Sequence, residues 1–344
     1  YTTCNVNLIL INDCSTDKRI SPLLEKLRDI KNITIIHNDS NLGYTRSINL
    51  GISHCKTDVI VLNSDTIVSP KWIENLANAA YSQKKIGTVT PLSDNAGAFS
   101  IFQEEESCRF PWWAKRTGIA RAVSSISMQS YPKVNTGNGF CMYIKRRLLN
   151  RVGLFDAKSF PIGYGEENDF CMRAYRSGWS NAIDESTIIY HKRTASFKER
   201  KTCLVSASRV KINQLHPDYK VLTNKYFNSK ELSLAKKRIK DLFSDFNNVK
   251  HFSQKTILYV LHESTGGTPA TSLDLASNLK EYRILFLTSN RKSMFLKSFY
   301  KGKMHLLKSW AFKRKLYPTD ISSKEYTRIT KDILLNYNVD IVHI

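Results

Sequence analysis

Carboxylate and amide side chains follow two apolar runs of the sequence, at the point where each run ends. The run 58–62 (DVIVL) stops at 63–66 (NSDT), and the run 6–11 stops at 12–17 (NDCSTD). Such runs suit strands covered on both faces, and open α/β sheets bind ligands just beyond the carboxyl ends of their strands. If the two strands are neighbours, Asp13 and Asp65 share one polar crevice. Taken singly, Asp13 and Asp17 also fit an Asx-turn that caps the next helix.

A glycine turn precedes a helical pattern at 41–51 (NLGYTRSINLG). Helix N-termini bind anions through their free amides, so a phosphate is expected near Gly43. Arg46 could add a charge-assisted contact to that phosphate. A plain loop is the alternative interpretation.

The segment 163–173 (GYGEENDFCMR) predicts a helix that begins near Glu166. Positions 167, 170, 171 and 174 form one stripe, so Glu167 shares the apolar face of this helix. Burial raises a carboxyl pKa toward the range of a general base, while the helix N-terminus lowers it. We prefer Glu167 as the base, with Glu166 and Asp169 as competitors. Asp169 and Arg173, four residues apart, would also fit a simple ion pair.

His191 closes the apolar run 187–190. A lone histidine at a strand end is more often structural than a ligand. Imidazole and carboxylate are nevertheless a suitable ligand pair for manganese or magnesium, so Asp65 and His191 are the candidate metal ligands.

Apolar runs and helical patterns alternate over the first 200 residues, which predicts the α/β class with a mostly parallel sheet between helices. The stretch 93–134 is irregular, and such segments are often lids or binding loops. The basic stretch 206–248 is expected to be a helical connector to a second α/β unit. The expected strands are 6–11, 33–36, 59–62, 86–90, 140–144, 187–190, 256–261, 284–287 and 339–344, and the expected helices are 21–29, 45–53, 70–82, 146–152, 166–177 and 270–279.

The composition is that of a globular protein with room for two domains, because 42% of its 344 residues are hydrophobic. No apolar run approaches the roughly 20 residues that span a bilayer, and no signal peptide is recognisable. Seven scattered cysteines fit a reducing compartment, so we expect a cytoplasmic protein.

The formal net charge of +22 is concentrated between residues 192 and 255, where 16 Lys or Arg stand against five Asp or Glu. This excess favours either a solvated basic face or peripheral contact with an anionic membrane at the inner face of the cell membrane. No nucleic-acid motif accompanies it, so nucleic acid is not an expected partner.

Five motifs, in this order, resemble glycosyltransferase family 2, the inverting nucleotide-sugar transferases of GT-A fold. They are 12–17, 41–51, 63–65 (NSD), 90–96 (TPLSDNA) and 165–170 (GEENDF), with His191 after them. The resemblance covers about residues 5–200, without the family's first strand. Asn12 and Asn63 each replace an aspartate of the family pattern, and Glu167 replaces the usual aspartate of the base motif.

The resemblance implies that Asp13 binds the nucleobase and ribose, and that Asp65 and His191 hold a divalent cation, manganese or magnesium, at the diphosphate. Glu167 stands where the family keeps its catalytic base. An acceptor hydroxyl would then displace the nucleoside diphosphate in a single inverting step. The residues expected to contact the nucleotide-sugar donor are Asn12, Asp13, Asp17, Asn41, Gly43, Arg46 and Asn63.

Residues 254–344 resemble the amino-terminal Rossmann-like half of a glycosyltransferase family 4 enzyme of GT-B fold, on 257–262 (ILYVLH), 266–268 (GGT) and 340–344 (DIVHI). The expected domains are a GT-A domain over 1–200, a basic helical connector over 201–252 and an incomplete GT-B half over 253–344. We expect a transferase of bacterial surface-polysaccharide synthesis, with a saccharide or lipid-linked saccharide as acceptor. The alternative is a catalytically decayed carbohydrate-binding or scaffold module within a larger tandem glycosyltransferase.

Overall fold

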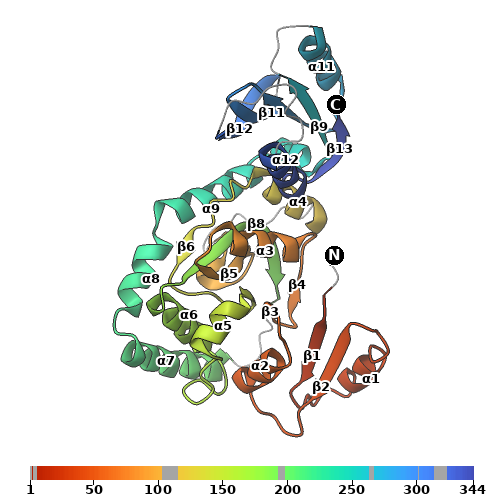
Figure 1. Cartoon of the computed structure of the whole chain (residues 1–344). Coiled ribbons are helices and arrows are strands. Elements are labelled where there is room, and N and C mark those ends of the chain that lie inside the picture. Colours follow the sequence, from red (N-terminus) through yellow and green to blue (C-terminus); the bar gives the residue numbers. More distant parts are fainter. Residues whose placement is uncertain are drawn as a thin grey trace. The chain divides into compact units, whose positions relative to one another are not determined.

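The computed structural model describes residues 2, 6–102, 115–192, 198–262, 267–300, 302–313 and 324–344 (Figure 1). The chain forms two compact units, and each is described by itself. Unit 1 comprises Tyr1–Arg109 and Gln129–Lys236, and unit 2 comprises Phe110–Met128 and Lys237–Ile344. This division differs from the boundaries expected at residues 200 and 252, because most of the basic helical segment belongs to unit 1.

Unit 1 begins with a small parallel sheet of two strands. The elements β1 (Leu8–Asn12), α1 (Ile20–Glu25), β2 (Ile33–His37) and α2 (Tyr44–Ser53) follow one another along the chain. Within the described residues β1 pairs with β2 alone. The expectation that the strands before Asp13 and Asp65 are neighbours is therefore wrong, and the two carboxylates come from different sheets.

A mixed six-stranded sheet forms the centre of unit 1, in the order β3-β7-β5-β8-β4 with β6 paired to β8. The pair β5 and β8 is parallel, whereas β7 runs antiparallel to both β3 and β5. The α/β class is confirmed, with β7 inserted where strict alternation predicted a parallel neighbour. The elements are β3 (Val59–Leu62), β4 (Thr66–Ile67), α3 (Trp72–Ser82), β5 (Ile86–Ser93), η1 (Gly97–Phe99), β6 (Lys133–Val134), β7 (Cys141–Ile144), α5 (Arg146–Val152), α6 (Glu166–Arg176) and β8 (Ser180–His191).

One apolar core holds α2, α5 and α6 against β3 and β7. Its α6 members, Phe170, Cys171 and Ala174, are completely buried, as the predicted stripe requires. Burying a large apolar side chain stabilises a fold by about 1.5–3 kcal/mol. The first turn of α6, with its two glutamates, is therefore held firmly in place.

The basic segment is helical, as expected, and consists of α7 (Lys198–Leu215), α8 (Tyr219–Phe227) and α9 (Lys230–Phe243). The start of α8 is tied to α6 by an ion pair between Arg176 and Asp218 at 2.9 Å. Its other end packs on η1, where the rings of Phe227 and Phe99 meet edge to face at 5.3 Å. The basic helical segment therefore packs against other elements of unit 1 and also connects the two units.

Unit 2 contains a five-stranded sheet in the order β12-β11-β10-β9-β13. The central strand β9 runs parallel to β10 and β13, and β11 forms antiparallel pairs with β10 and β12. Separate apolar clusters include α11 on one side and α12 on the other. The elements are α10 (Phe246–Ser253), β9 (Thr256–His262), α11 (Gly267–Asn278), β10 (Arg283–Ser289), β11 (Ser293–Tyr300), β12 (Lys303–Ala311), α12 (Lys324–Asn336) and β13 (Val339–His343).

A helix that the sequence did not predict, α4 (Arg116–Ile126), lies in the stretch expected to be irregular and belongs to unit 2. The guanidinium of Arg283, which is completely buried, donates to Ser125 O at 3.0 Å and to Tyr337 O at 3.3 Å. Burial lowers the pKa of Arg283 to about 10. Residues 103–114 of the stretch 93–134 lie outside the described residues, as does Gly266 of the glycine turn. No helix in the described ranges has the length and hydropathy needed to cross a membrane.

Candidate active site

Asp65 and His191 lie side by side because β4 pairs with the end of β8. Thr66 is opposite His191 in this antiparallel register, so the preceding residue reaches the imidazole. The Asp65 carboxylate Oδ1 is 3.3 Å from His191 Nε2, and both side chains are largely buried. The structure thus brings the two candidate metal ligands together.

The orientation of His191 is set by the segment 93–96. The backbone N–H of His191 donates to Asp94 Oδ1 at 2.8 Å, and its Nδ1 is 3.0 Å from Asn95 O. A carbonyl oxygen can only accept, so Nδ1 carries the proton and the lone pair of a neutral ring lies on Nε2, toward Asp65. Metal-bound histidines commonly donate their second nitrogen to a carbonyl in this way.

These two side chains fit a divalent cation as a partial ligand set. Two acceptors that face each other at 3.3 Å leave a place for a positive charge between them. Among the described residues no cluster of three or more His, Cys, Asp and Glu could hold a metal ion. A cation held by Asp65 and His191 would therefore need further oxygen ligands, which water or a substrate could supply.

Tyr44, which the sequence analysis did not single out, connects α2 to the metal-ligand loop. Its hydroxyl lies 3.3 Å from Asn63 Oδ1 and 3.1 Å from Gly139 O. Burial, together with the charges of Glu166 and Glu167, raises the pKa of Tyr44 well above its usual value, so the hydroxyl stays a donor. A Cβ on Gly139 would lie 2.9 Å from that hydroxyl, so glycine is required for this close approach.

Asp13 is held at the N-terminus of α2. Its carboxylate accepts from Asn38 Nδ2 at 2.8 Å, from Leu42 N at 2.7 Å and from Gly43 N at 3.0 Å. Desolvation acts to raise the pKa of Asp13, but these hydrogen bonds outweigh it and the pKa is lowered. Amides that were expected to bind a phosphate are thus bonded to Asp13.

Gly43 occupies a position that only glycine fits. Its φ of 81° is in the left-handed region, and a Cβ there would lie 2.6 Å from Pro161 O. The glycine turn was therefore a valid signal for the helix start, where Asp13 and α2 meet.

The other candidate donor-binding residues separate into two groups. Asn12 accepts from Ser15 N at 3.0 Å, and Asn41 donates to Asp13 O at 3.3 Å, so both shape the loop after β1. Asp17 is exposed and pairs with Arg19 at 2.6 Å, and it makes no side-chain cap of α1. Arg46 is exposed and has no ion-pair partner within the described residues.

Glu166 and Glu167 form a coupled acidic pair at the first turn of α6. Glu166 is buried, and its Oε2 accepts from Gly165 N at 3.0 Å. Glu167 Oε2 is buried and has no hydrogen-bond partner within the described residues. Burial and the charge of Glu166 raise the pKa of Glu167 well above its usual value, and burial raises that of Glu166. Such a carboxylate suits proton transfer near neutral pH.

Asp169 is engaged by Arg173 and His216. Its carboxylate lies 2.7 Å from Arg173 Nε and 2.9 Å from His216 Nε2. The ion pair expected with Arg173 is therefore present. A hollow of about 460 Å³ borders this group and is lined by Leu154, Asp156, Asp169, Arg173, Leu215 and His216.

Residues 1–153 match the model of glycosyl transferase family 2. The match covers the motifs 12–17, 41–51, 63–65 and 90–96 and agrees with the resemblance seen there, whereas 165–170 and His191 lie beyond it. A protein of Haemophilus influenzae (strain ATCC 51907 / DSM 11121 / KW20 / Rd), described as an uncharacterized glycosyltransferase, is 38% identical over 73 residues. That alignment covers 21% of this chain and 23% of the relative, so the chain matches less than a quarter of the relative's length.

Two solved structures show distant likeness to the chain. GalNAc-T7 with UDP, GalNAc and Mn2+ aligns with a TM-score of 0.43 at 13% identity, over 70% of this chain and 50% of that one. The mannosyltransferase PcManGT of Pyrobaculum calidifontis, in complex with GDP-Man and Mn2+, aligns with a TM-score of 0.42 at 14% identity, over 79% and 70%. Both scores are below 0.5, and neither likeness supports a functional conclusion.

Proposed function

We propose that unit 1 is an inverting glycosyltransferase that moves a sugar from a nucleotide-diphosphate sugar to a hydroxyl of a saccharide or lipid-linked saccharide. The supporting observation is one cluster that surrounds Tyr44. The Tyr44 hydroxyl donates a hydrogen bond to Asn63 Oδ1 at 3.3 Å. Burial and the charges of Glu166, Glu167 and Asp65 together raise its pKa. An acidic pair with a raised pKa and a metal-ligand pair thus lie around one residue.

In the proposed reaction Glu167 accepts the proton of the acceptor hydroxyl. The acceptor oxygen forms a bond to the anomeric carbon as the bond from that carbon to the phosphate oxygen breaks. The nucleoside diphosphate leaves with the electron pair, and the configuration inverts. Asp65 and His191 would hold a divalent cation, manganese or magnesium, which when bound neutralises charge on the diphosphate. Asn63, where the family has an aspartate, contributes an amide in place of a charge.

An active transferase releases nucleoside diphosphate from its donor, whereas the alternative, a decayed carbohydrate-binding or scaffold module, does not. The replacements Asn12 and Asn63 are the argument for decay, and the presence of Asp65, Glu167 and His191 together is the argument against it. We expect release of nucleoside diphosphate from at least one member of a panel of UDP-, GDP- and dTDP-sugars with Mn2+ or Mg2+. Binding of a nucleotide sugar without any release would favour the module.

Activity is expected to rise with pH through the raised pKa of Glu167, because only the deprotonated carboxylate accepts a proton. Glu166→Gln removes the neighbouring charge that raises this pKa, so the acid limb of kcat/KM should move to lower pH. Initial rates of nucleoside diphosphate release between about pH 5 and 9 measure both profiles. An acid limb at the same pH in wild type and variant would contradict the assignment of Glu167.

For unit 2 we propose a partial Rossmann-like half of a family 4 glycosyltransferase. Support comes from β9, which lies between β10 and β13 and is parallel to both. The antiparallel hairpin of β11 and β12 departs from an all-parallel half. Two transferases in tandem would fit the assembly of a surface polysaccharide in the bacterial cytoplasm.

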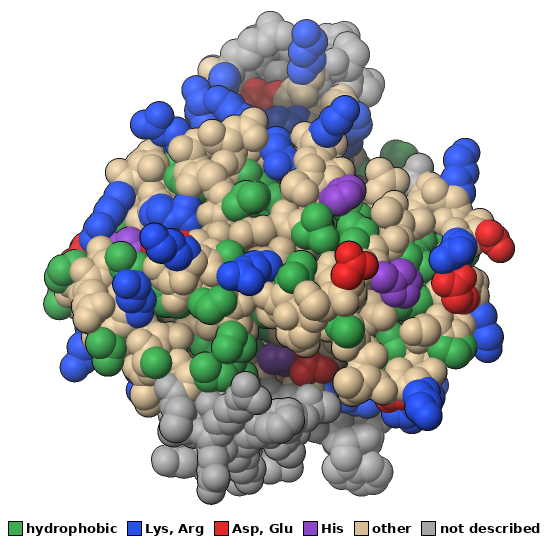
Figure 2. Space-filling view, turned by 90° about the horizontal axis from the view of Figure 1, so that it is seen from below, with side chains coloured by type: hydrophobic (Ala, Val, Ile, Leu, Met, Phe, Trp, Pro, Cys, Tyr) green, Lys and Arg blue, Asp and Glu red, His purple; other side chains and the backbone are tan. Residues whose placement is uncertain are grey.

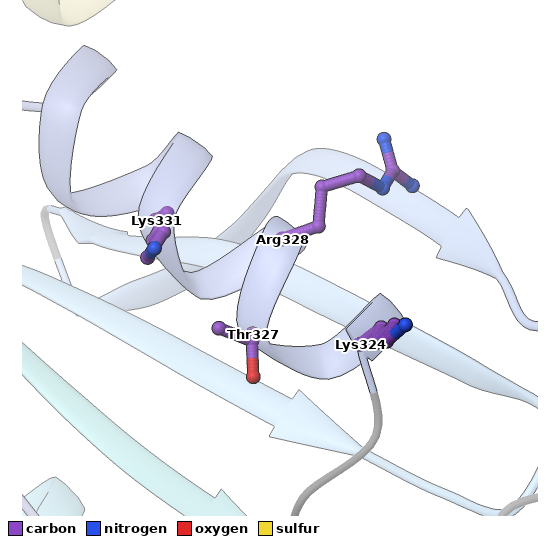
Figure 3. A pocket seen from close by; sticks show the side chains of 4 residues that line it. All are labelled: Lys324, Thr327, Arg328 and Lys331. Carbon is purple, nitrogen blue, oxygen red and sulfur yellow. The ribbon is translucent and has the colours of Figure 1, made fainter.

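A basic stripe on α12, defined as Lys324, Thr327, Arg328 and Lys331, supports a further part of the proposal, contact with an anionic membrane. These residues line a hollow of about 320 Å³ (Figure 3). The acidic residues of α12 are engaged elsewhere, since Asp332 pairs with Lys308 at 3.3 Å and Glu325 accepts from Lys313 N at 3.4 Å. Lys and Arg side chains are also spread over the face drawn in Figure 2.

Replacing Lys324, Arg328 and Lys331 together by Gln is expected to weaken binding to phosphatidylserine vesicles by about 100-fold, since each cation contributes about 1 kcal/mol near an anionic surface. Co-sedimentation with vesicles at low salt measures the affinity. The matched control replaces three exposed lysines of unit 2, Lys250, Lys280 and Lys303, by Gln. Equal losses in both variants would indicate a general charge effect and no docking stripe.

A further inference from the structure

His191 is held by a short loop, residues 93–101, which we call the histidine loop. The backbone N–H of His191 donates to Asp94 Oδ1 at 2.8 Å, and its Nδ1 lies 3.0 Å from Asn95 O. The ring of Phe140 stacks on the imidazole, with centroids 5.4 Å apart and an angle of 21° between the planes. These contacts fix both the tautomer and the orientation of the ring.

The histidine loop is closed by hydrogen bonds between its own residues. Ser93 and Ser100 form a β-bridge, and Ile101 N donates to Ser93 O at 3.0 Å. Ala96 N donates to Ser100 Oγ at 2.8 Å, which ties the middle of the loop to its end. Because both ends and the middle are joined, a displacement of the turn at η1 should also shift the two acceptors that hold His191.

The turn of the histidine loop is attached to the basic helical segment. Lys236 of α9 donates to Ala98 O at 2.7 Å. The ring of Phe227, the last residue of α8, meets the buried ring of Phe99 edge to face at 5.3 Å. All of these residues belong to unit 1. A continuous series of hydrogen bonds and ring contacts therefore connects α8 and α9 to His191.

We infer that the basic helical segment positions His191 for metal binding through the histidine loop. Asp94, Phe227 and Lys236 are then positioning residues of the metal site. The inference rests on the proposed function, in which Asp65 and His191 hold the cation. Residues that orient a metal ligand contribute to metal affinity although they do not touch the metal. The helical segment therefore supports the metal site in addition to connecting the two units.

The test observes the His191 ring directly, in the whole chain labelled with nitrogen-15 in its histidines. Long-range proton–nitrogen NMR spectra show which ring nitrogen carries the proton, at about pH 8, where an ordinary imidazole is neutral. We expect the proton on Nδ1 in the wild type. Titration with Mn2+ alone broadens the signals of a ring that binds the ion, and the Mn2+ concentration for half-broadening measures affinity. The His191 signals are those lost in His191→Gln.

Asp94→Ala removes the acceptor of the His191 backbone N–H. The Mn2+ concentration for half-broadening should rise about 10- to 100-fold, the usual effect of losing a residue that orients a metal ligand. The Nδ1–H tautomer should also lose its predominance. Asp94→Asn keeps an acceptor oxygen, so it should restore the tautomer and most of the affinity. A residue that only stabilised the fold would change the melting temperature and leave the tautomer of the folded protein unchanged.

Lys236→Met and Phe227→Leu test the contribution of the helices. Each variant removes one contact of the histidine loop, a hydrogen bond or a ring pair, so each should raise the half-broadening concentration about 3- to 10-fold. Lys237→Met is the matched control, because Lys237 is the next residue of α9 and pairs with Asp241 of the same helix at 3.0 Å. This control should bind Mn2+ as the wild type does.

Three results would each overturn the inference. They are a wild-type His191 that Mn2+ does not broaden, an Asp94→Ala variant with unchanged tautomer and affinity, and helix variants that both behave like Lys237→Met. Mn2+ binding at His191 that depends on the histidine loop and the helices, without release of nucleoside diphosphate from any donor, would support the inference and contradict the proposed transferase function.

Discussion

Glu167→Gln should reduce kcat for sugar transfer by about 10²- to 10⁴-fold, the usual contribution of a positioned general base. The amide keeps the size of the side chain but cannot take the acceptor's proton. Donor affinity should be retained, because in the proposed reaction Glu167 acts on the acceptor hydroxyl and Asp65 and His191 act at the diphosphate. Release of nucleoside diphosphate with acceptor measures kcat, and calorimetry with the donor measures affinity.

The competing carboxylate provides the control for this experiment. Asp169→Asn removes the partner of Arg173 and His216, so it should lower the melting temperature and leave the chemistry of the folded protein largely intact. Near-normal turnover by Glu167→Gln would place the base on Glu166 or Asp169. A large loss of donor affinity in Glu167→Gln would assign the residue to the donor side.

Asp65→Ala should weaken metal-dependent donor binding by about 100-fold or more. Loss of a residue that hydrogen-bonds to a metal ligand typically lowers metal affinity 10- to 100-fold. Loss of Asp65 should have at least this effect, because it is one of the two proposed protein ligands. Calorimetry of nucleotide binding with Mn2+ and with EDTA separates the metal-dependent part. The expected result is that the variant in Mn2+ binds no better than the wild type in EDTA.

An exposed aspartate of unit 1 serves as the matched control for the lost charge. Asp39→Ala should bind nucleotide with and without Mn2+ as the wild type does. If Asp65→Ala keeps its metal-dependent affinity, the cation is held elsewhere, and the contact between Asp65 and His191 is only a structural hydrogen bond.

Local patterns predicted much of the secondary structure. The expected helix 146–152 coincides with α5, and the stripe through Phe170 and Cys171 marks the buried face of α6. These elements follow from apolar periodicity, which is a property of neighbouring residues. The start of α3 was less readable, because the expected helix 70–82 begins in the structure at Trp72, after Lys71 with φ of 60°.

The candidate residues were recognisable by type and motif, but their partners were not. Asp65 and His191 are 126 positions apart, and their contact depends on the pairing of β4 with β8. Likewise, no sequence pattern distinguishes Asp169, which is engaged by Arg173 and His216, from Glu167, whose Oε2 has no hydrogen-bond partner within the described residues. Tyr44 had no signal beyond its place after Gly43.

By itself, the sequence determined the α/β class, the family 2 motifs of the first part and the carboxylates and histidine that can do chemistry, because these reside in residue types and short spacings. Only the tertiary structure decided that β1 and β3 lie in different sheets, that α4 belongs to unit 2 and that the start of α8 is tied to α6 by the ion pair of Arg176 and Asp218. These features arise from pairing and burial between segments far apart in the chain, where the energy of a contact depends on the whole fold.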